Sequence, residues 1–132
     1  MLEFTEGGSI MPTNFHIVDI FEKPIDRRIE EVIKVDQTDE DVVYQELTEY
    51  VVTDSIRDQY LTLLERYYET PLRPHEGIGV WISGFFGSGK SSFAKTLGYI
   101  LEGRYVRGFP ATDLFLQQAN DPRLAVILKS IN

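Results

Sequence analysis

Residues 84–91 read Gly-Phe-Phe-Gly-Ser-Gly-Lys-Ser and set the narrowest limits on how this chain can fold. They match the pattern G-x-x-x-x-G-K-[ST] in full, which requires a strand before the loop and a helix after it. The segment 77–83 is short, apolar and flanked by glycine, which is typical of a buried parallel strand. Residues 90–102 place apolar side chains at helical spacing. The sequence therefore predicts a strand–loop–helix unit of the α/β class.

The loop has the residue types that a phosphate site requires. Glycine permits backbone angles closed to other residues and leaves the amides of residues 87–91 free to converge on phosphate oxygens. The helix that follows points its positive end at the same place. We expect Lys90 to act as the catalytic cation on the β- and γ-phosphates and the Ser91 hydroxyl to ligate Mg²⁺. The expected nucleotide-binding residues are Gly84, Gly87, Ser88, Gly89, Lys90, Ser91 and Ser92.

Phe85 and Phe86 occupy variable positions of the motif, where phosphate chemistry needs no particular side chain. Large aromatic side chains mostly serve burial, so we expect one or both to pack under the loop or against a neighbour that is missing from this chain. Stacking on a nucleobase is the alternative.

The composition excludes several classes of function. The 132-residue chain has no cysteine, which rules out disulfides, zinc–thiolate sites and thiol catalysis. No apolar run approaches the ~18–20 residues that span a bilayer. The N-terminus carries acidic residues where a signal peptide needs basic ones. A cytoplasmic location without membrane contact is expected.

The net charge of −8 is unevenly distributed along the chain. Residues 1–76 hold 18 acidic and 7 basic side chains, a net charge of −11, whereas residues 77–132 hold 3 and 6, a net charge of +3. Such asymmetry suggests two functional parts, with the basic part suited to an anionic ligand. The acidic part is a poor surface for the nucleic-acid backbone, so DNA contact by this chain is not expected.

Three regions are predicted: a flexible leader over residues 1–14, an acidic and mainly helical region over residues 15–76, and the start of a P-loop NTPase domain over residues 77–132. Residues 29–35 are β-branched at four of seven positions and form a plausible strand.

Local signals predict the helices. Thr38 and Thr53 are each expected to cap a helix, and Pro71 to stop the second one. The apolar face of the first helix is Val43, Leu47 and Tyr50, and that of the second is Ile56, Tyr60, Leu63, Leu64 and Tyr67. Gly103 is expected to end the helix that follows the loop. Beyond it we expect a polar connector over residues 104–112, a short helix over residues 113–118, and a last helix that starts at residues 120–122.

The residues after Ser91 do not include the acidic residue that this fold needs for nucleotide hydrolysis. This fold needs an acidic residue at the end of a second buried strand to hold Mg²⁺. Only Glu102, Asp113 and Asp121 follow, and none of them ends such a strand. A doubly wound sheet also needs about five strands. The predicted fold is therefore an incomplete P-loop NTPase, truncated before the Walker B acid.

Four blocks in order carry a resemblance to a known family: residues 21–27, 32–35, 45–53 and 79–91. Together they resemble the N-terminal region of the large P-loop ATPase of BREX phage-defence systems, the BrxC/PglY type. The most specific parts are Ser-Gly-Phe-Phe-Gly-Ser-Gly-Lys-Ser and Glu-Tyr-Val-Val-Thr. The resemblance spans roughly residues 17–131.

The resemblance implies ATP binding and hydrolysis within a bacterial multi-protein system that distinguishes self from phage DNA. It implies as partners the other components of that system, among them a DNA methyltransferase and an alkaline-phosphatase-like protein. Members of the family are many times longer than this chain. We therefore expect an N-terminal fragment that binds ATP but does not hydrolyse it alone.

Two other functions remain open on the residues alone. One is a small P-loop kinase-like phosphotransferase, although such enzymes usually carry the loop near the N-terminus. The other is a non-catalytic interaction module with a vestigial loop, in which a partner covers the exposed edge of the incomplete sheet.

Overall fold

The computed structural model describes residues 16–26, 38–71 and 79–131. The chain divides into two compact units, residues 1–31 and 32–132. The described part of the first unit contains a short 3-10 helix, η1 (Ile17–Ile20), whose Asp19 carboxylate accepts a hydrogen bond from the His16 amide at 2.8 Å. The predicted leader over residues 1–14 and the predicted strand over residues 29–35 lie outside the described residues.

Helix α1 (Glu40–Thr48) begins one residue later than its predicted cap implies. The Asp39 carboxylate, not the Thr38 hydroxyl, caps it by accepting a hydrogen bond from the Asp41 amide at 2.9 Å. Aspartate caps a helix at least as well as threonine, so the expectation for Thr38 was wrong by one position. Val43 and Leu47 are buried as their spacing predicts.

Helix α2 (Asp54–Glu69) begins where the sequence predicts. The Thr53 hydroxyl caps it by accepting a hydrogen bond from the Ile56 amide at 3.4 Å. Its buried face consists of Tyr60, Leu61 and Leu64. Tyr67, which was expected on the same face, is instead exposed near the end of the helix.

Three helices follow the glycine loop: α3 (Lys90–Leu101), α4 (Ala111–Ala119) and α5 (Pro122–Ile131). Gly103 adopts the left-handed conformation (φ 65°) just after α3, as predicted. Asn120 (φ 45°) ends α4 in the same way, and Pro122 occupies the first position of α5, where the missing amide hydrogen costs nothing. Helix α4 is longer than the 113–118 segment expected from the sequence.

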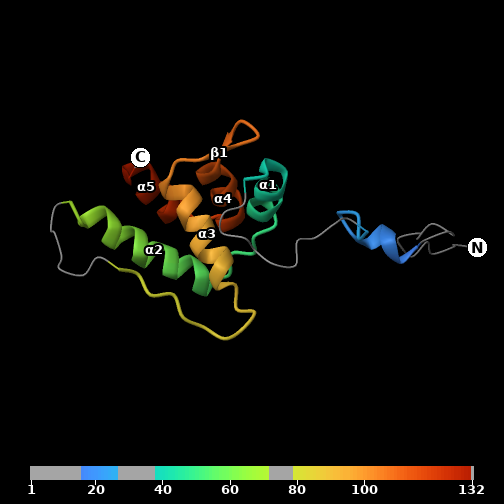
Figure 1. Cartoon of the computed structure of the whole chain (residues 1–132), viewed down its shortest axis with the longest axis horizontal. Helices are drawn as coiled ribbons and strands as arrows, with labels where there is room; N and C mark the ends of the chain where they lie inside the picture. The colour runs from blue at the N-terminus through green and yellow to red at the C-terminus, as the bar shows by residue number, and fades with distance from the viewer. Residues whose placement is uncertain (1–15, 27–37, 72–78, 132) are drawn as a thin grey trace, which may run out of the picture. The chain divides into compact units, whose positions relative to one another are not determined.

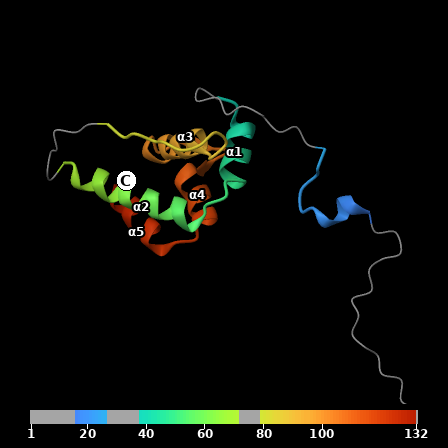
Figure 2. The same ribbon diagram turned by 90° about the horizontal axis from the view of Figure 1, so that it is seen from below.

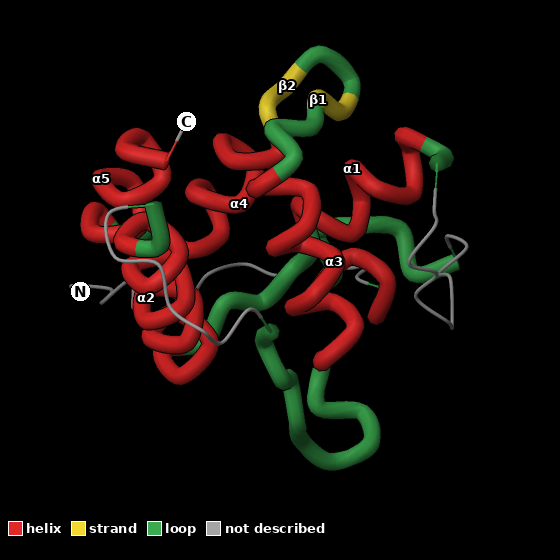
Figure 3. The backbone as a smooth tube through the Cα atoms, turned by 60° about the vertical axis from the view of Figure 1, so that its left-hand side comes forward, coloured by secondary structure: helices red, strands yellow, loops and turns green. Residues whose placement is uncertain are grey.

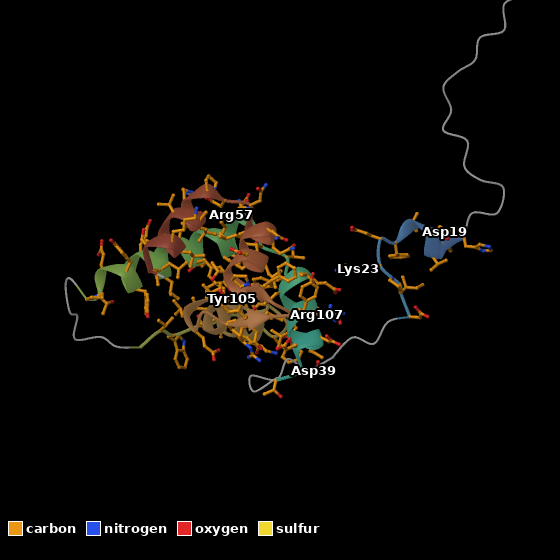
Figure 4. The ribbon with its side chains drawn as sticks, turned by 90° about the horizontal axis from the view of Figure 1, so that it is seen from above. Asp19, Lys23, Asp39, Arg57, Tyr105 and Arg107 are labelled. Atoms are coloured by element: carbon orange, nitrogen blue, oxygen red, sulfur yellow. The ribbon has the colours of Figure 1, made fainter. Side chains whose placement is uncertain are left out.

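Residues 105–110 form a hairpin where a polar connector was expected. Strands β1 (Tyr105–Val106) and β2 (Phe109–Pro110) pair antiparallel around Arg107 and Gly108, which both have positive φ (50° and 80°). Two such residues make the turn type that matches the twist of paired strands. The Arg107 guanidinium contacts the Asp41 carboxylate at 2.6 and 2.8 Å, which fastens the turn to the start of α1. Figure 3 shows the hairpin, and in Figure 4 Arg107 lies beside α1.

Helix α4 connects two clusters of buried side chains. It contacts α1, α3 and α5, whose arrangement can be followed in Figures 1 and 2. One cluster joins α2, α3, α4 and α5 around Tyr60, Ile100, Phe115 and Leu128. The other joins α1, α3, β1 and α4 around Leu47, Tyr99, Val106 and Leu114. The described parts of the expected acidic region and of the expected NTPase region therefore share both clusters.

The predicted strand before the loop is not formed in the described residues. Residues 79–83 have no strand pairing there, and the Val80 and Trp81 side chains are 65% and 91% exposed. A parallel strand is buried only when neighbouring strands and helices cover it, and the β1–β2 hairpin does not pair with this segment. None of the described helices is long and apolar enough to cross a membrane.

Candidate phosphate-binding site

The loop between residues 84 and 89 turns through two left-handed glycines. Gly87 has φ 77° and Gly89 has φ 81°, and Gly89 is the residue that caps α3. An L-residue in this conformation costs about 1–2 kcal/mol because its Cβ approaches the following carbonyl. The glycines of the motif predict backbone angles closed to other residues, and the structure confirms this conformation at Gly87 and Gly89.

Gly84 is a glycine for a different reason than the one predicted. It does not adopt a positive φ, but a Cβ at this position would lie 2.6 Å from the Ser88 Oγ. The loop therefore folds back so closely on its own start that only a hydrogen atom fits unless Ser88 rotates. The Ser88 amide donates a hydrogen bond to the Phe85 carbonyl at 3.2 Å, which closes this turn.

The Lys90 ammonium is hydrogen-bonded to the start of the loop. Its Nζ donates to the Gly84 carbonyl at 3.0 Å and to the Phe85 carbonyl at 2.7 Å. A lysine ammonium has three donors, so one of them remains for a ligand once these two bonds are made. The two carbonyls thereby hold a positive charge next to the loop amides, which is what a phosphate group requires.

The first turn of α3 supplies further donors beside this ammonium. The Phe93 amide makes the first bond of the helix, to the Gly89 carbonyl at 2.9 Å. The amides of residues 90–92 precede that bond and so have no partner within the helix. The Ser91 hydroxyl is exposed on the same turn, and Ser92 is half-buried. Loop amides, helix amides, the ammonium and the Ser91 hydroxyl therefore lie within one short segment.

A groove of about 480 Å³ extends from this segment along α3. Its lining includes Lys90 and Ser91 at one end and Lys95, Tyr99, Glu102 and Arg104 farther along. The Lys95 ammonium is 2.6 Å from the Glu46 carboxylate of α1, and the Arg104 guanidinium lies over the Tyr99 ring at 4.8 Å. Lys95, Tyr99 and Arg104 were not predicted as site residues, although Lys95 and Tyr99 follow Ser91 at intervals of four positions on one helix face.

Phe85 and Phe86 do not pack under the loop. Their side chains are 90% and fully exposed, so the expectation that they pack under the loop was wrong within the described residues. Packing against a neighbour that is missing from this chain stays a prediction. They form one exposed apolar stretch with Val80 and Trp81 on the chain that leads into α3.

The three acidic residues after Ser91 have separate positions. Glu102 caps the C-terminal end of α3, Asp113 lies in the first turn of α4, and Asp121 precedes α5, where it binds Arg123. In residues 16–26, 38–71 and 79–131, no group of three or more acidic or histidine side chains could hold a metal ion. The sequence predicts the Ser91 hydroxyl as the protein ligand of Mg²⁺, and Mg²⁺ commonly takes its remaining ligands from nucleotide phosphates and water.

Comparisons with family models and with solved structures add no information about the site. No family model matches the chain, and no solved structure matches it. Support for a function therefore comes from the loop, from α3 and from the sequence motif that joins them.

Proposed function

We propose that residues 84–91 bind ATP together with Mg²⁺. The observation that supports this most is the position of Lys90, whose ammonium is held by two loop carbonyls at 2.7 and 3.0 Å with one donor to spare. The left-handed Gly87 and Gly89 and the free amides at the start of α3 surround it with further donors. Such an arrangement favours a polyanion over a neutral ligand.

We further propose that the chain is the ATP-binding N-terminal portion of a BREX-type phage-defence ATPase that works in the cytoplasm. The four sequence blocks, above all residues 45–53 and 79–91, support this proposal. Its partners would be the other components of that system, and residues outside this chain would complete hydrolysis. The positions of the acidic residues that follow Ser91 favour binding alone, because Glu102, Asp113 and Asp121 lie on separate elements and Asp121 is paired with Arg123.

The test is a titration of a fluorescent ATP analogue with Mg²⁺ against the wild type, Lys90→Ala and Lys129→Ala. Lys129 is an exposed lysine in the last turn of α5, so its replacement removes the same charge away from the loop. We expect Lys90→Ala to lose at least about ten-fold in affinity, since a charge-assisted hydrogen bond contributes about 1.5–3 kcal/mol. Equal affinity in all three proteins would overturn ATP binding at this loop.

A second candidate function is suggested by the exposed apolar stretch around Trp81, Phe85 and Phe86. Large exposed apolar patches mark interaction sites, which would suit a module that binds a partner without using a nucleotide. Trp81 is the single tryptophan of the chain, so its fluorescence reports on this stretch directly. A blue shift on addition of a partner, with no effect of Mg²⁺ and ATP in the titration above, would favour this second function.

A further inference from the structure

Tyr60 of α2 makes two contacts with the same residue of α3. Its ring stacks on the Phe93 ring with centroids 4.2 Å apart and planes inclined by 28°. Its hydroxyl donates a hydrogen bond to the Phe93 carbonyl at 3.0 Å. Tyr60 is completely buried, so both contacts are made away from solvent. Phe93 is thus held by its side chain and by its backbone from one neighbouring residue.

Phe93 belongs to the turn that forms the candidate phosphate site. Its amide donates to the carbonyl of Gly89, the left-handed residue that caps α3, at 2.9 Å. Lys90, whose ammonium crosses the loop, lies three residues before it. A displacement of Phe93 along the helix would therefore move the amides and the ammonium that face the ligand.

Tyr60 also contacts helix α4. Its ring packs against Phe115 of α4, with centroids 4.7 Å apart and planes inclined by 55°. Helix α2 is also fixed by Arg57, whose Nε donates to the Ala119 carbonyl at the end of α4 at 3.1 Å. Through its contacts with Phe93, Tyr60 therefore joins the start of α3 to α2 and α4.

The hydroxyl of Tyr60 remains a donor over the whole physiological range. Burial raises the pKa of Tyr60 well above its usual value, so the phenol stays protonated. Phenylalanine at this position would keep the stack and lose the bond to the Phe93 carbonyl. Tyr60→Phe therefore separates the contribution of the hydrogen bond from that of the ring stack.

We infer that Tyr60 is a positioning residue for the phosphate loop, which fixes the first turn of α3 through the Phe93 carbonyl. This inference rests on the proposed function, because its consequence is a change in the affinity for Mg²⁺ and ATP. It assigns to helix α2 a part in shaping the site, although no side chain of α2 lines the groove beside the loop.

The experiment compares wild type, Tyr60→Phe and Val43→Ala at a temperature where circular dichroism shows all three to be folded. Val43 is fully buried in the other cluster, so Val43→Ala lowers stability without touching Tyr60 or Phe93. We expect Tyr60→Phe to weaken the binding of the fluorescent ATP analogue about five-fold, which corresponds to one net hydrogen bond. Val43→Ala is expected to bind like the wild type.

Hydrogen exchange gives a reading that does not depend on the nucleotide. The Phe93 amide, which is bonded to the Gly89 carbonyl, should exchange faster in Tyr60→Phe than in the wild type, and Val43→Ala should leave its exchange unchanged relative to the rest of α3. If the wild type binds no nucleotide, the proposed function fails while the exchange rates still decide whether Tyr60 fixes this turn. Unchanged affinity in Tyr60→Phe beside a functional wild type, or unchanged exchange of the Phe93 amide, would overturn the inference.

Discussion

The Lys95 ammonium of α3 lies 2.6 Å from the Glu46 carboxylate of α1, and this ion pair joins the basic and acidic parts of the chain. The Lys95 side chain is 4% exposed and the Glu46 side chain 22%. Lys95 also lies 5.9 Å above the Tyr99 ring, which adds to its fixed position. A lysine so deeply buried is tolerated because a carboxylate is held beside it.

Removal of one partner of this pair should be costly. Glu46→Gln leaves the buried ammonium of Lys95 uncompensated, and we expect a loss of about 3 kcal/mol in the free energy of unfolding measured with urea. The matched control is Asp58→Asn, which breaks the exposed Arg123–Asp58 pair at 3.7 Å and should cost less than about 1 kcal/mol. A Glu46→Gln loss no larger than that of the control would contradict the buried character of the pair.

Gly84 and Gly89 should respond differently to alanine. At Gly89 the strain lies in the backbone, so Gly89→Ala should cost about 1–2 kcal/mol whatever surrounds it. At Gly84 the new Cβ would come too close to the Ser88 Oγ alone, at 2.6 Å, so Gly84→Ala should cost about 1 kcal/mol for a rotated Ser88. Ser88→Ala should remove that cost, because the nearest remaining atom of residue 88 is then 3.5 Å away.

Gly98 provides the control for these glycines. It lies within α3 and has open space where a Cβ would point, so Gly98→Ala should stabilise the protein by about 0.5–1 kcal/mol. Thermal and urea unfolding of the four variants would check the order. A Gly84→Ala loss that persists in the Ser88→Ala background would show that the close approach is not the cause.

Asp121 should give the unfolding free energy a dependence on acid pH. The hydrogen bonds from Arg123 hold the pKa of the Asp121 carboxyl below its usual value of 3.8. A lowered folded-state pKa stabilises the protein above the unfolded-state pKa, and this stability is lost as the pH falls through the folded-state value. Urea midpoints between pH 7 and pH 2.5 should therefore fall less steeply in Asp121→Asn than in the wild type. Parallel curves would contradict the lowered pKa.

Three tyrosines should make the protein sensitive to alkaline pH. Burial raises the pKa of Tyr50, Tyr60 and Tyr99 above the usual value of 10.0. A raised folded-state pKa stabilises the protein below the unfolded-state value, and this stability is lost as the pH rises above about 10. Phenolate absorbance of the folded protein should therefore rise at higher pH than that of the urea-unfolded chain. Superimposed titrations of the two states would refute the burial of these hydroxyls.

Several elements of this protein are determined by the sequence itself. Thr53 caps α2, Gly103 ends α3, and Pro122 begins α5, all where the residues predict. The conformations of Gly87 and Gly89 follow from the loop motif in the same way. These signals act between residues at most four positions apart, so a local reading of the chain is sufficient to find them. Helix α1 shows the limit of such local prediction. Thr38 and Asp39 are adjacent and both are good capping residues, and the structure uses Asp39 rather than the predicted Thr38.

The tertiary structure alone decides the contacts between distant segments. The Tyr60 contact with Phe93, the Lys95 pair with Glu46 and the Arg107 contact with Asp41 join residues 33, 49 and 66 positions apart. No local pattern specifies such pairs, because they depend on how the helices pack. The same reason explains the prediction for residues 79–83. Their apolar composition is that of a strand, but a strand needs a neighbour to pair with, and the described residues provide none.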